Sequence, residues 1–306
     1  MPVTSADIPG LLLPGLKTAF FNTFQEQPHQ WQSVATMIPS DKDTERYAWL
    51  GATPGINEFL DERKTGDLRE YDYAIKNKTW ESTIAVDRTA IEDDQYGQIA
   101  MRVKQLAGSS SSFLDALVFG MLGGGFVNSC YDTLPFFSAA HPLGKPGDGF
   151  GTASNKGTDV LSSASLQAAI TQMMRFQNDQ GRPMGVMPDL LVVPPELYWE
   201  AATLLNSAFY PDLIPGVGQN LGMNPLKGLL SLVQTPFLPN SANWFLLDTK
   251  RVVKATILQM RKDFEFEALE QSSETGFLRD VFYYGVRARF NAGYGDWRAA
   301  FGSQVA

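Results

Sequence analysis

The sequence predicts a mixed fold of helices and strands, the α+β class, from three patterns along the chain. Apolar residues recur at steps of three and four between residues 92 and 120, which is typical of one long amphipathic helix. Residues that should face the core alternate with the others at 80–87, and again at 264–267 and 282–291, which indicates half-buried strands. Between these patterns, 189–247 combines short strand and helix signals and predicts a small α/β unit.

The first strand and the long helix follow one another in the chain. The residues of the strand that should face the core are Trp80, Ser82, Ile84 and Val86. The apolar stripe of the helix consists of Ile99, Val103, Leu106, Ser110, Phe113 and Leu117. Asp93 and Asp94 suit its N-terminal end, where carboxylates meet the positive end of the helix dipole, and the glycine run 123–125 ends it. A helix of about 25 residues would be nearly 40 Å long.

The remaining elements lie in the second half of the chain. The predicted order is a helix at 165–178, a strand at 189–194, a helix that Pro195 begins, strands at 229–234 and 244–247, and a closing hairpin. The hairpin strands contain Phe264 and Phe266 in one and 282–290 in the other, and its turn is expected at 272–276.

Composition and charge exclude several classes of protein. Of the 306 residues, 44% are hydrophobic and 19% charged, which argues against wholesale disorder. The net charge of −8 makes sequence-independent binding of nucleic acid by the whole chain unfavourable. Cys130 is the single cysteine, so no intrachain disulfide forms. We find no basic leader and no apolar run of the roughly 18 residues that a membrane span needs, so we expect a chain that stays in the cytoplasm where it is made.

The charges are unevenly distributed. Between residues 41 and 70, 13 of 30 residues are charged, too many to fill a core, and this stretch reads as a projecting loop or as an ordinary solvated one. Between residues 129 and 245, only 13 of 117 are charged, which indicates that part of this surface faces other protein.

A catalytic or metal site is not evident. The only histidines are His29 and His141, no G-x-S-x-G motif exists, and no Cys/His cluster predicts zinc. The glycines at 123–125 lack the lysine of a phosphate-binding loop, and those at 216–222 miss the dinucleotide-binding spacing. We therefore expect no catalytic residues, no cofactor and no metal, and a structural protein rather than an enzyme.

Four stretches carry a resemblance to a known family. They are NKTWESTIAVDRTAIEDDQYG, NSCYDTLPFFSAAHP, MPDLLVVPPELYWEAATLLNS and the tail RVVKATILQMRKDFEFEAL…DVFYYGVRARFNAGYGDWRAAFG. They are similar to the Mu-like phage major head subunit family, and the order of elements resembles the HK97-type phage capsid fold. The resemblance covers nearly the whole chain. It implies an N-terminal arm at 1–42, an extended loop at 43–76, a peripheral domain at 77–128 and 246–306 with a long spine helix and a long β-hairpin, and an axial α/β domain at 129–245.

The resemblance also implies a function and partners. The chain would be a major capsid protein of a tailed double-stranded DNA bacteriophage or prophage, assembled in the bacterial cytoplasm into hexamers and pentamers of an icosahedral virion shell. Portal, scaffolding and decoration proteins would be further partners, and packaged DNA would be contacted weakly and without sequence preference. The extended loop would lie on a neighbouring subunit. In it we expect five interface residues: Trp49, Phe59, Arg63, Lys64 and Arg69.

Two other functions stay open at the level of sequence. An encapsulin-like compartment shares the fold but encloses protein cargo instead of DNA. A soluble enzyme of unknown type is the third possibility, and the scarcity of catalytic residues argues against it.

Overall fold

The computed structural model describes residues 8–47, 50, 73–87, 89, 96–143, 151–178, 181–209, 223–269 and 280–305. The helices are α1 Ile8–Glu26, α2 Trp31–Val34, α4 Tyr96–Gly124, α5 Ser163–Met174 and α6 Tyr198–Asn206, with short 3-10 helices η1 Pro195–Leu197 and η2 Trp297–Ala299. The strands are β1 Ala35–Pro39, β2 Thr44–Arg46, β3 Ala74–Lys76, β4 Lys78–Asp87, β5 His141–Pro142, β6 Thr152–Ala153, β7 Lys156–Gly157, β8 Leu190–Val193, β9 Ser231–Gln234, β10 Trp244–Leu247, β11 Thr256–Leu269, β12 Val281–Tyr294 and β13 Ala300–Ser303.

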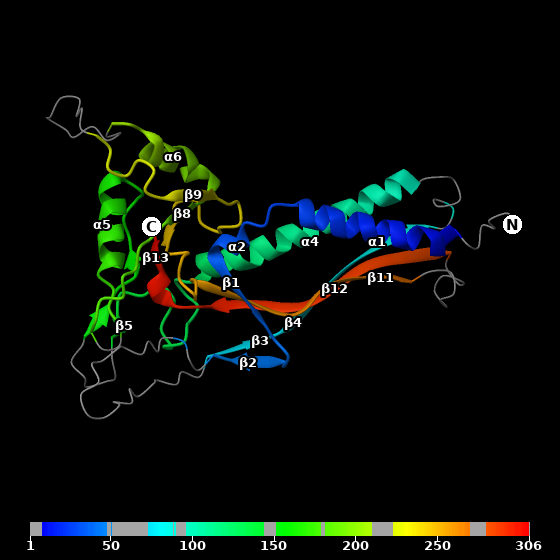
Figure 1. Cartoon of the computed structure of the whole chain (residues 1–306), viewed down its shortest axis with the longest axis horizontal. Coiled ribbons are helices and arrows are strands. Elements are labelled where there is room, and N and C mark those ends of the chain that lie inside the picture. Colours follow the sequence, from blue (N-terminus) through cyan, green and yellow to red (C-terminus); the bar gives the residue numbers. More distant parts are fainter. Residues whose placement is uncertain are drawn as a thin grey trace, which may run out of the picture.

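These elements form an elongated molecule with two parts (Figure 1). One part is a long arm in which α1 and α4 run along strands β4, β11 and β12. The other part, at the left of the view, holds α5 and α6 around a second sheet that contains β8, β9 and β13. The combination of helices and largely antiparallel strands confirms the predicted α+β class.

The sheet of the arm has the strand order β1-β11-β12-β4. Strand β12 pairs antiparallel with both β11 and β4, and β1 joins the far edge parallel to β11. Every second residue of β12 from Phe282 to Phe290 is buried, and in β11 Phe264 and Phe266 are buried between exposed glutamates. These burial patterns confirm the two alternating strands predicted from the sequence. The expected turn at 272–276 lies outside the described residues.

Helix α4 confirms the predicted long helix. It has 29 residues, about 43 Å at 1.5 Å per residue, and it ends within the predicted glycine run. Its predicted start near Asp93 lies outside the described residues. Ile99, Val103 and Leu106 are buried, as the stripe predicted, and the helix continues without a break through Gly108.

Helix α1 was not predicted as a helix, because Pro9 and Pro14 interrupt its apolar run. It nevertheless packs along α4 and against β11, with Leu16 and Phe20 fully removed from solvent. The ring centroid of Phe20 lies 5.6 Å from that of Phe266. Burial of these side chains offsets the cost of a proline inside the helix.

Helix α4 is also long and apolar enough to cross a membrane by the criteria of length and hydropathy, which the sequence analysis did not anticipate. Half of its most apolar 18-residue window is buried inside the protein, against α1 and the sheet of the arm. The core helix of a soluble protein meets the same criteria, so this finding is weak evidence for a membrane.

The second sheet has the strand order β7-β13-β10-β8-β9. Both β8 and β10 are buried at every residue, which is typical of central strands covered on two faces. A capping box at Ser162 begins α5, where Ser162 and Ser165 each accept a hydrogen bond from the other's backbone N–H. The predicted helices and strands of 165–247 are thereby confirmed, while the four-part division of the chain into domains remains a prediction.

The two sheets are connected by five residues, Gly295 to Ala299. The chain leaves β12 at Tyr294, turns through η2 and enters β13, so it crosses from one sheet to the other. Trp297 and Arg298 in this turn are buried, at 1% and 2% exposure. This junction is therefore part of the core, and not a flexible linker.

We expect Gly295→Ala to lower the free energy of unfolding by about 1–3 kcal/mol, because overpacking a core has this cost. An added Cβ would lie 2.1 Å from the backbone oxygen of Lys254. The matched control is Gly108→Ala in α4, where an added Cβ meets nothing within 4 Å. The control should raise the free energy of unfolding by about 0.5–1 kcal/mol, since alanine is favoured over glycine inside helices. Urea unfolding of the unassembled subunit measures both changes in the free energy of unfolding. If the two substitutions changed it equally, the close contact of Gly295 with Lys254 would be contradicted.

Candidate functional site

The five interface residues predicted from the sequence all lie outside the described residues. They are Trp49, Phe59, Arg63, Lys64 and Arg69. Their role remains a prediction. We therefore searched the described residues for clusters of reactive side chains, grooves and exposed apolar surface.

Cys130, Asp132 and His141 form a buried cluster beside the junction. Their donor atoms all lie within 4.8 Å of one another. The Cys130 thiol donates to Asp132 Oδ1 at 3.0 Å, and Asp132 Oδ2 forms an ion pair with His141 Nδ1. The backbone N–H of Leu134 also donates to Asp132 Oδ1, at 3.1 Å. The segment between α4 and β5 is thus folded around one carboxylate.

Asn155 sets the orientation of the His141 ring. The Nδ2 group of Asn155 donates to the carbonyl oxygens of Phe136 and Trp297, and its Oδ1 accepts from the backbone N–H of Ser138. His141 Nε2 lies 3.2 Å from both Phe136 O and Asn155 Oδ1, which are acceptors. Nε2 therefore carries a proton and donates it to them.

The protonation of this cluster argues against catalysis. Burial, followed by the charge of Asp132, raises the pKa of the Cys130 thiol far above its usual value. Burial alone would also raise the pKa of Asp132, but hydrogen bonds from His141 and Cys130 reverse this, and the net pKa is lowered. A buried neutral thiol that donates to a carboxylate, and not to a histidine, is a poor nucleophile.

Trp297 connects this cluster to a second buried pair. The His141 ring stacks on Trp297 at a centroid distance of 4.2 Å with 6° between the planes. The guanidinium carbon of Arg298 lies 4.8 Å from the centroid of the Trp297 ring. Tyr131 OH donates to Asp296 and accepts from Arg298 Nη1. The turn of the junction therefore holds Tyr131 directly, and it holds Asp132 through His141, whose ring stacks on Trp297.

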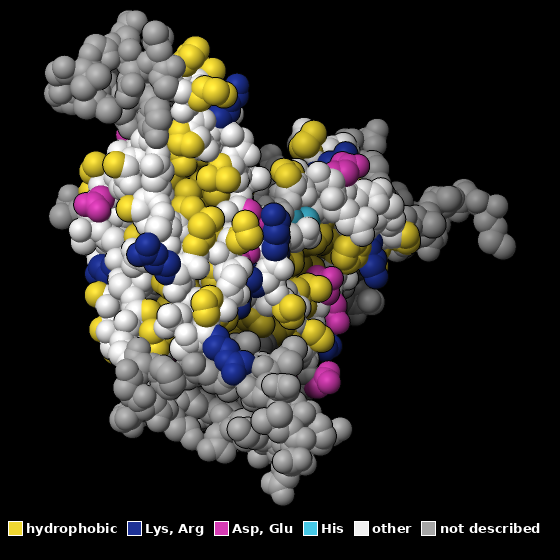
Figure 2. All heavy atoms as spheres, turned by 60° about the vertical axis from the view of Figure 1, so that its left-hand side comes forward, with side chains coloured by type: hydrophobic (Ala, Val, Ile, Leu, Met, Phe, Trp, Pro, Cys, Tyr) yellow, Lys and Arg dark blue, Asp and Glu magenta, His cyan; other side chains and the backbone are white. Residues whose placement is uncertain are grey.

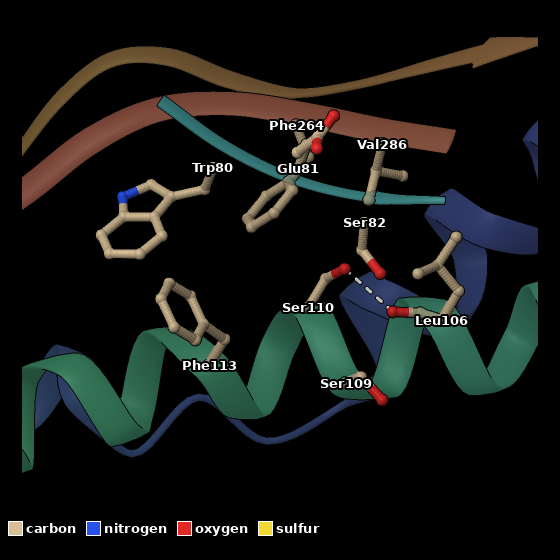
Figure 3. Close-up of a pocket in the computed structure, with 9 residues that line it drawn as sticks. All are labelled: Trp80, Glu81, Ser82, Leu106, Ser109, Ser110, Phe113, Phe264 and Val286. Carbon is tan, nitrogen blue, oxygen red and sulfur yellow. Dashed lines mark hydrogen bonds between the residues drawn. The ribbon is translucent and has the colours of Figure 1, made fainter. Parts of the chain in front are cut away.

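A groove opens between α4 and the sheet of the arm (Figure 3). Its volume is about 230 Å³, and the residues that line it are Trp80, Glu81, Ser82, Leu106, Ser109, Ser110, Phe113, Phe264 and Val286. Trp80 and Phe113 face each other across the groove, with ring centroids 4.7 Å apart. The Ser110 hydroxyl is bound to the backbone oxygen of Leu106 at 2.8 Å. Glu81 is the one ionisable residue in this lining, so the groove is suited to apolar contact and not to acid–base chemistry.

Large apolar side chains are exposed around α6. Trp199 is 78% exposed and Met223 is 85% exposed, and Phe209 and Leu229 are about half exposed. Figure 2 brings this part of the molecule forward and shows hydrophobic side chains in a broken band with few charged groups between them. We call Trp199, Phe209, Met223 and Leu229 the α6 patch. Exposed apolar side chains that cluster on a surface are often sites of protein–protein contact.

Comparison with known proteins identifies the family. The sequence profile of the family described as Mu-like prophage major head subunit gpT matches residues 11–160, 146–238 and 239–306. This chain belongs to that family.

Relatives and solved structures agree with this membership. The chain is 27% identical over 301 residues to a Mu-like prophage FluMu major head subunit of Haemophilus influenzae, with 98% of this chain and 74% of the relative covered. It is 26% identical over 311 residues to the major capsid protein of Escherichia phage Mu, with 78% of this chain and all of the relative covered. A chain of the procapsid of bacteriophage JBD30 superposes with a TM-score of 0.58 at 29% identity, over 97% of this chain and 76% of that one.

The comparisons confirm two expectations from the sequence. The fold is that of HK97-type phage capsid proteins, and the chain is a major head subunit of a phage or prophage. An encapsulin-like compartment is not favoured, since the matched family and both relatives are phage head subunits.

Sequence reasoning missed the buried cluster in this head subunit. The sequence analysis used Cys130 only to exclude an intrachain disulfide, and the structure buries it at 4% exposure. His141 was considered alone, yet it lies against Cys130 and Asp132 because the chain folds back between α4 and β5. The available signal was the spacing Cys-x-Asp with a histidine nine residues beyond Asp132, which is short enough for one loop to bring them together.

We expect Asp132→Asn to lower the free energy of unfolding by about 3–5 kcal/mol at pH 7, because it removes one partner of a buried ion pair. The measurement is urea unfolding of the unassembled subunit in the presence of a chelator. The control is Asp43→Asn, whose carboxylate is 58% exposed and lies 3.5 Å from Arg289 and 3.9 Å from Lys76. Exposed pairs contribute about 0–1 kcal/mol, so a control effect as large as that of Asp132→Asn would contradict this ranking.

Proposed function

We propose that this head subunit assembles into hexamers and pentamers of an icosahedral shell that encloses double-stranded DNA. The single observation that carries the proposal is the α6 patch, which lies in the charge-poor part of a chain that belongs to a head-subunit family. The shell would assemble in the bacterial cytoplasm and become part of the virion. In this role the chain is a structural subunit and not an enzyme.

The α6 patch supports contact with other subunits. Trp199 lies on α6 and Met223 follows it in the chain, and both expose most of their side chains. Tryptophan is among the residues that contribute most to protein interfaces when it becomes buried there. The low charge of 129–245 removes the repulsion that identical subunits would otherwise meet around a common axis.

Residues 43–76 are the second surface that we propose for assembly. This stretch is too charged to be the core of its own subunit, and its basic residues Arg63, Lys64 and Arg69 would meet acidic neighbours. Trp49 and Phe59 would anchor apolar contacts there. Single exposed ion pairs contribute little, about 0–1 kcal/mol, but a closed shell repeats each of them in every subunit.

We propose weak, sequence-independent contact with packaged DNA, together with portal, scaffolding and decoration proteins as further partners. The net charge of −8 per subunit opposes strong attraction to phosphates. A shell wall that held DNA tightly would also hinder its packaging and release. The membership in a head-subunit family supports the other partners.

We expect Trp199→Glu to abolish assembly while the subunit stays folded, because a charge would then be buried without a partner between subunits. Trp199→Phe is the matched control, and it should retain assembly because it keeps an aromatic side chain. Size-exclusion chromatography with light scattering measures assembly, and thermal unfolding measures the fold. Normal shells from Trp199→Glu would show that α6 faces solvent in the assembly.

Deletion of residues 55–68 should give a folded subunit that assembles poorly. The physical reason is that this charged stretch would contribute contacts to a neighbour and not to its own core. Electron microscopy of the purified protein measures shell formation, and circular dichroism measures the fold. A deletion of this kind that forms shells as efficiently as the full chain would rule out the proposed role of the loop.

A further inference from the structure

The cluster of Cys130, Asp132 and His141 has a use beyond assembly. We propose that these three side chains bind one divalent transition-metal ion, with Zn²⁺ as the best fit. The thiolate of Cys130, a carboxylate oxygen of Asp132 and Nδ1 of His141 would be the three protein ligands. The ion would be structural, and it would connect the segment after α4 to β5.

The first argument is the orientation of the His141 ring. Among the described residues, Nε2 faces two oxygen acceptors, Phe136 O and Asn155 Oδ1, each at 3.2 Å, so a ring proton is held at Nε2. The other ring nitrogen, Nδ1, faces the carboxylate oxygen Oδ2 of Asp132. In this structure Nδ1 and Oδ2 are 2.5 Å apart, the separation of a hydrogen bond, so a proton bridges them. A metal ion would take the place of that proton, and the two side chains would move apart by less than about 1 Å to hold it.

The second argument is the set of atoms around that cation. Histidine ligands of metals usually donate their other ring N–H to a carbonyl or carboxylate oxygen, which fixes the ring for binding. The pair formed by Phe136 O and Asn155 Oδ1 meets that requirement. Thiolate and imidazole are ligands that zinc prefers, and carboxylate completes many zinc sites. A water would complete the fourth position of a tetrahedral ion, since Asp132 Oδ1 accepts the backbone N–H of Leu134.

The third argument is charge balance in a buried place. The thiolate of Cys130 and the carboxylate of Asp132 together carry two negative charges, which equal the charge of Zn²⁺. When Zn²⁺ binds, the thiol proton leaves to solvent and a zinc–sulfur bond replaces the S–H bond. The site with the metal bound therefore carries no net charge. The side chains of His141 and Asp132 are 0% and 2% exposed, and a site there is tolerated only without net charge.

The metal would act on the junction between the sheets. His141 stacks on Trp297, and Asn155 donates to the backbone oxygen of Trp297. An ion bound to Cys130, Asp132 and His141 would therefore connect the end of α4 to the turn that leads into β13. Since the unfolded chain would not hold this arrangement, metal binding should stabilise the folded subunit.

The test uses the full-length subunit, purified without chelator, with zinc chloride as the probe. We expect one zinc per chain by elemental analysis and the release of at least one proton per zinc in a weakly buffered titration, from the thiol of Cys130. At free zinc about 100-fold above its dissociation constant, the thermal midpoint should rise by about 5–10 °C over the sample in EDTA. An unchanged midpoint, or zinc that binds without releasing protons, would overturn the proposal and leave the cluster as a hydrogen-bonded set alone.

Two variants separate this site from surface binding. Cys130→Ser keeps a hydroxyl donor for Asp132 but lacks the thiolate, so it should lose the zinc-dependent rise in the midpoint. His29→Gln removes the other histidine of the chain, which is half-buried with Nδ1 3.2 Å from the Ser111 hydroxyl on α4, and should leave the rise unchanged. If Cys130→Ser does not fold, the wild-type proton release and midpoint still decide the question. A rise that survives in folded Cys130→Ser, or that His29→Gln abolishes, contradicts the assignment.

Discussion

The buried turn between β12 and β13 is the constraint on which the rest of the structure depends. Five residues carry the chain from the sheet of the arm into the second sheet, and the indole of Trp297 contacts both the ring of His141 and the guanidinium of Arg298. These two contacts with one indole fix the direction in which the chain leaves β12. Because β12 and β13 are each paired inside a sheet, fixing this turn fixes the relation of the two sheets.

Burying charged groups at this junction costs free energy, because the charges lose their contacts with water. A buried ion pair often contributes no more than apolar residues of the same size would, since both charges must leave water. Asp132 and Asp296 instead give directional contacts that a purely apolar core would lack, to His141 in one case and to Tyr131 and Arg298 in the other. In a head subunit, any change in the angle between the two sheets would be repeated in every copy. A junction that fixes one angle therefore justifies the free energy lost when its charged groups leave water. The proposed metal ion would strengthen the same constraint.

Much of the fold was predictable because local periodicity determined it. Ile99, Val103 and Leu106 lie on one face of α4 for any packing partner, and β12 buries alternate residues because a strand has a period of two. Helix α1 was not predicted, because the burial of Phe20 against Phe266 comes from a residue some 250 positions away. The interface residues near Trp49 and Phe59 rest on the family resemblance, since a charge pattern indicates exposure but not a partner.

By itself, the sequence determined the element types, the charge-poor half of the chain and the family, because each depends on residues that are near in the chain or on order along it. Only the tertiary structure decided which side chains meet in the core. Asn155 contacts Trp297 across 142 positions, and Tyr131 contacts Arg298 across 167. Likewise, β13 lies beside β10 in the second sheet although it follows directly from the arm. Contacts of this kind depend on how whole sheets pack. A local pattern of residues cannot show which positions so far apart in the sequence will meet.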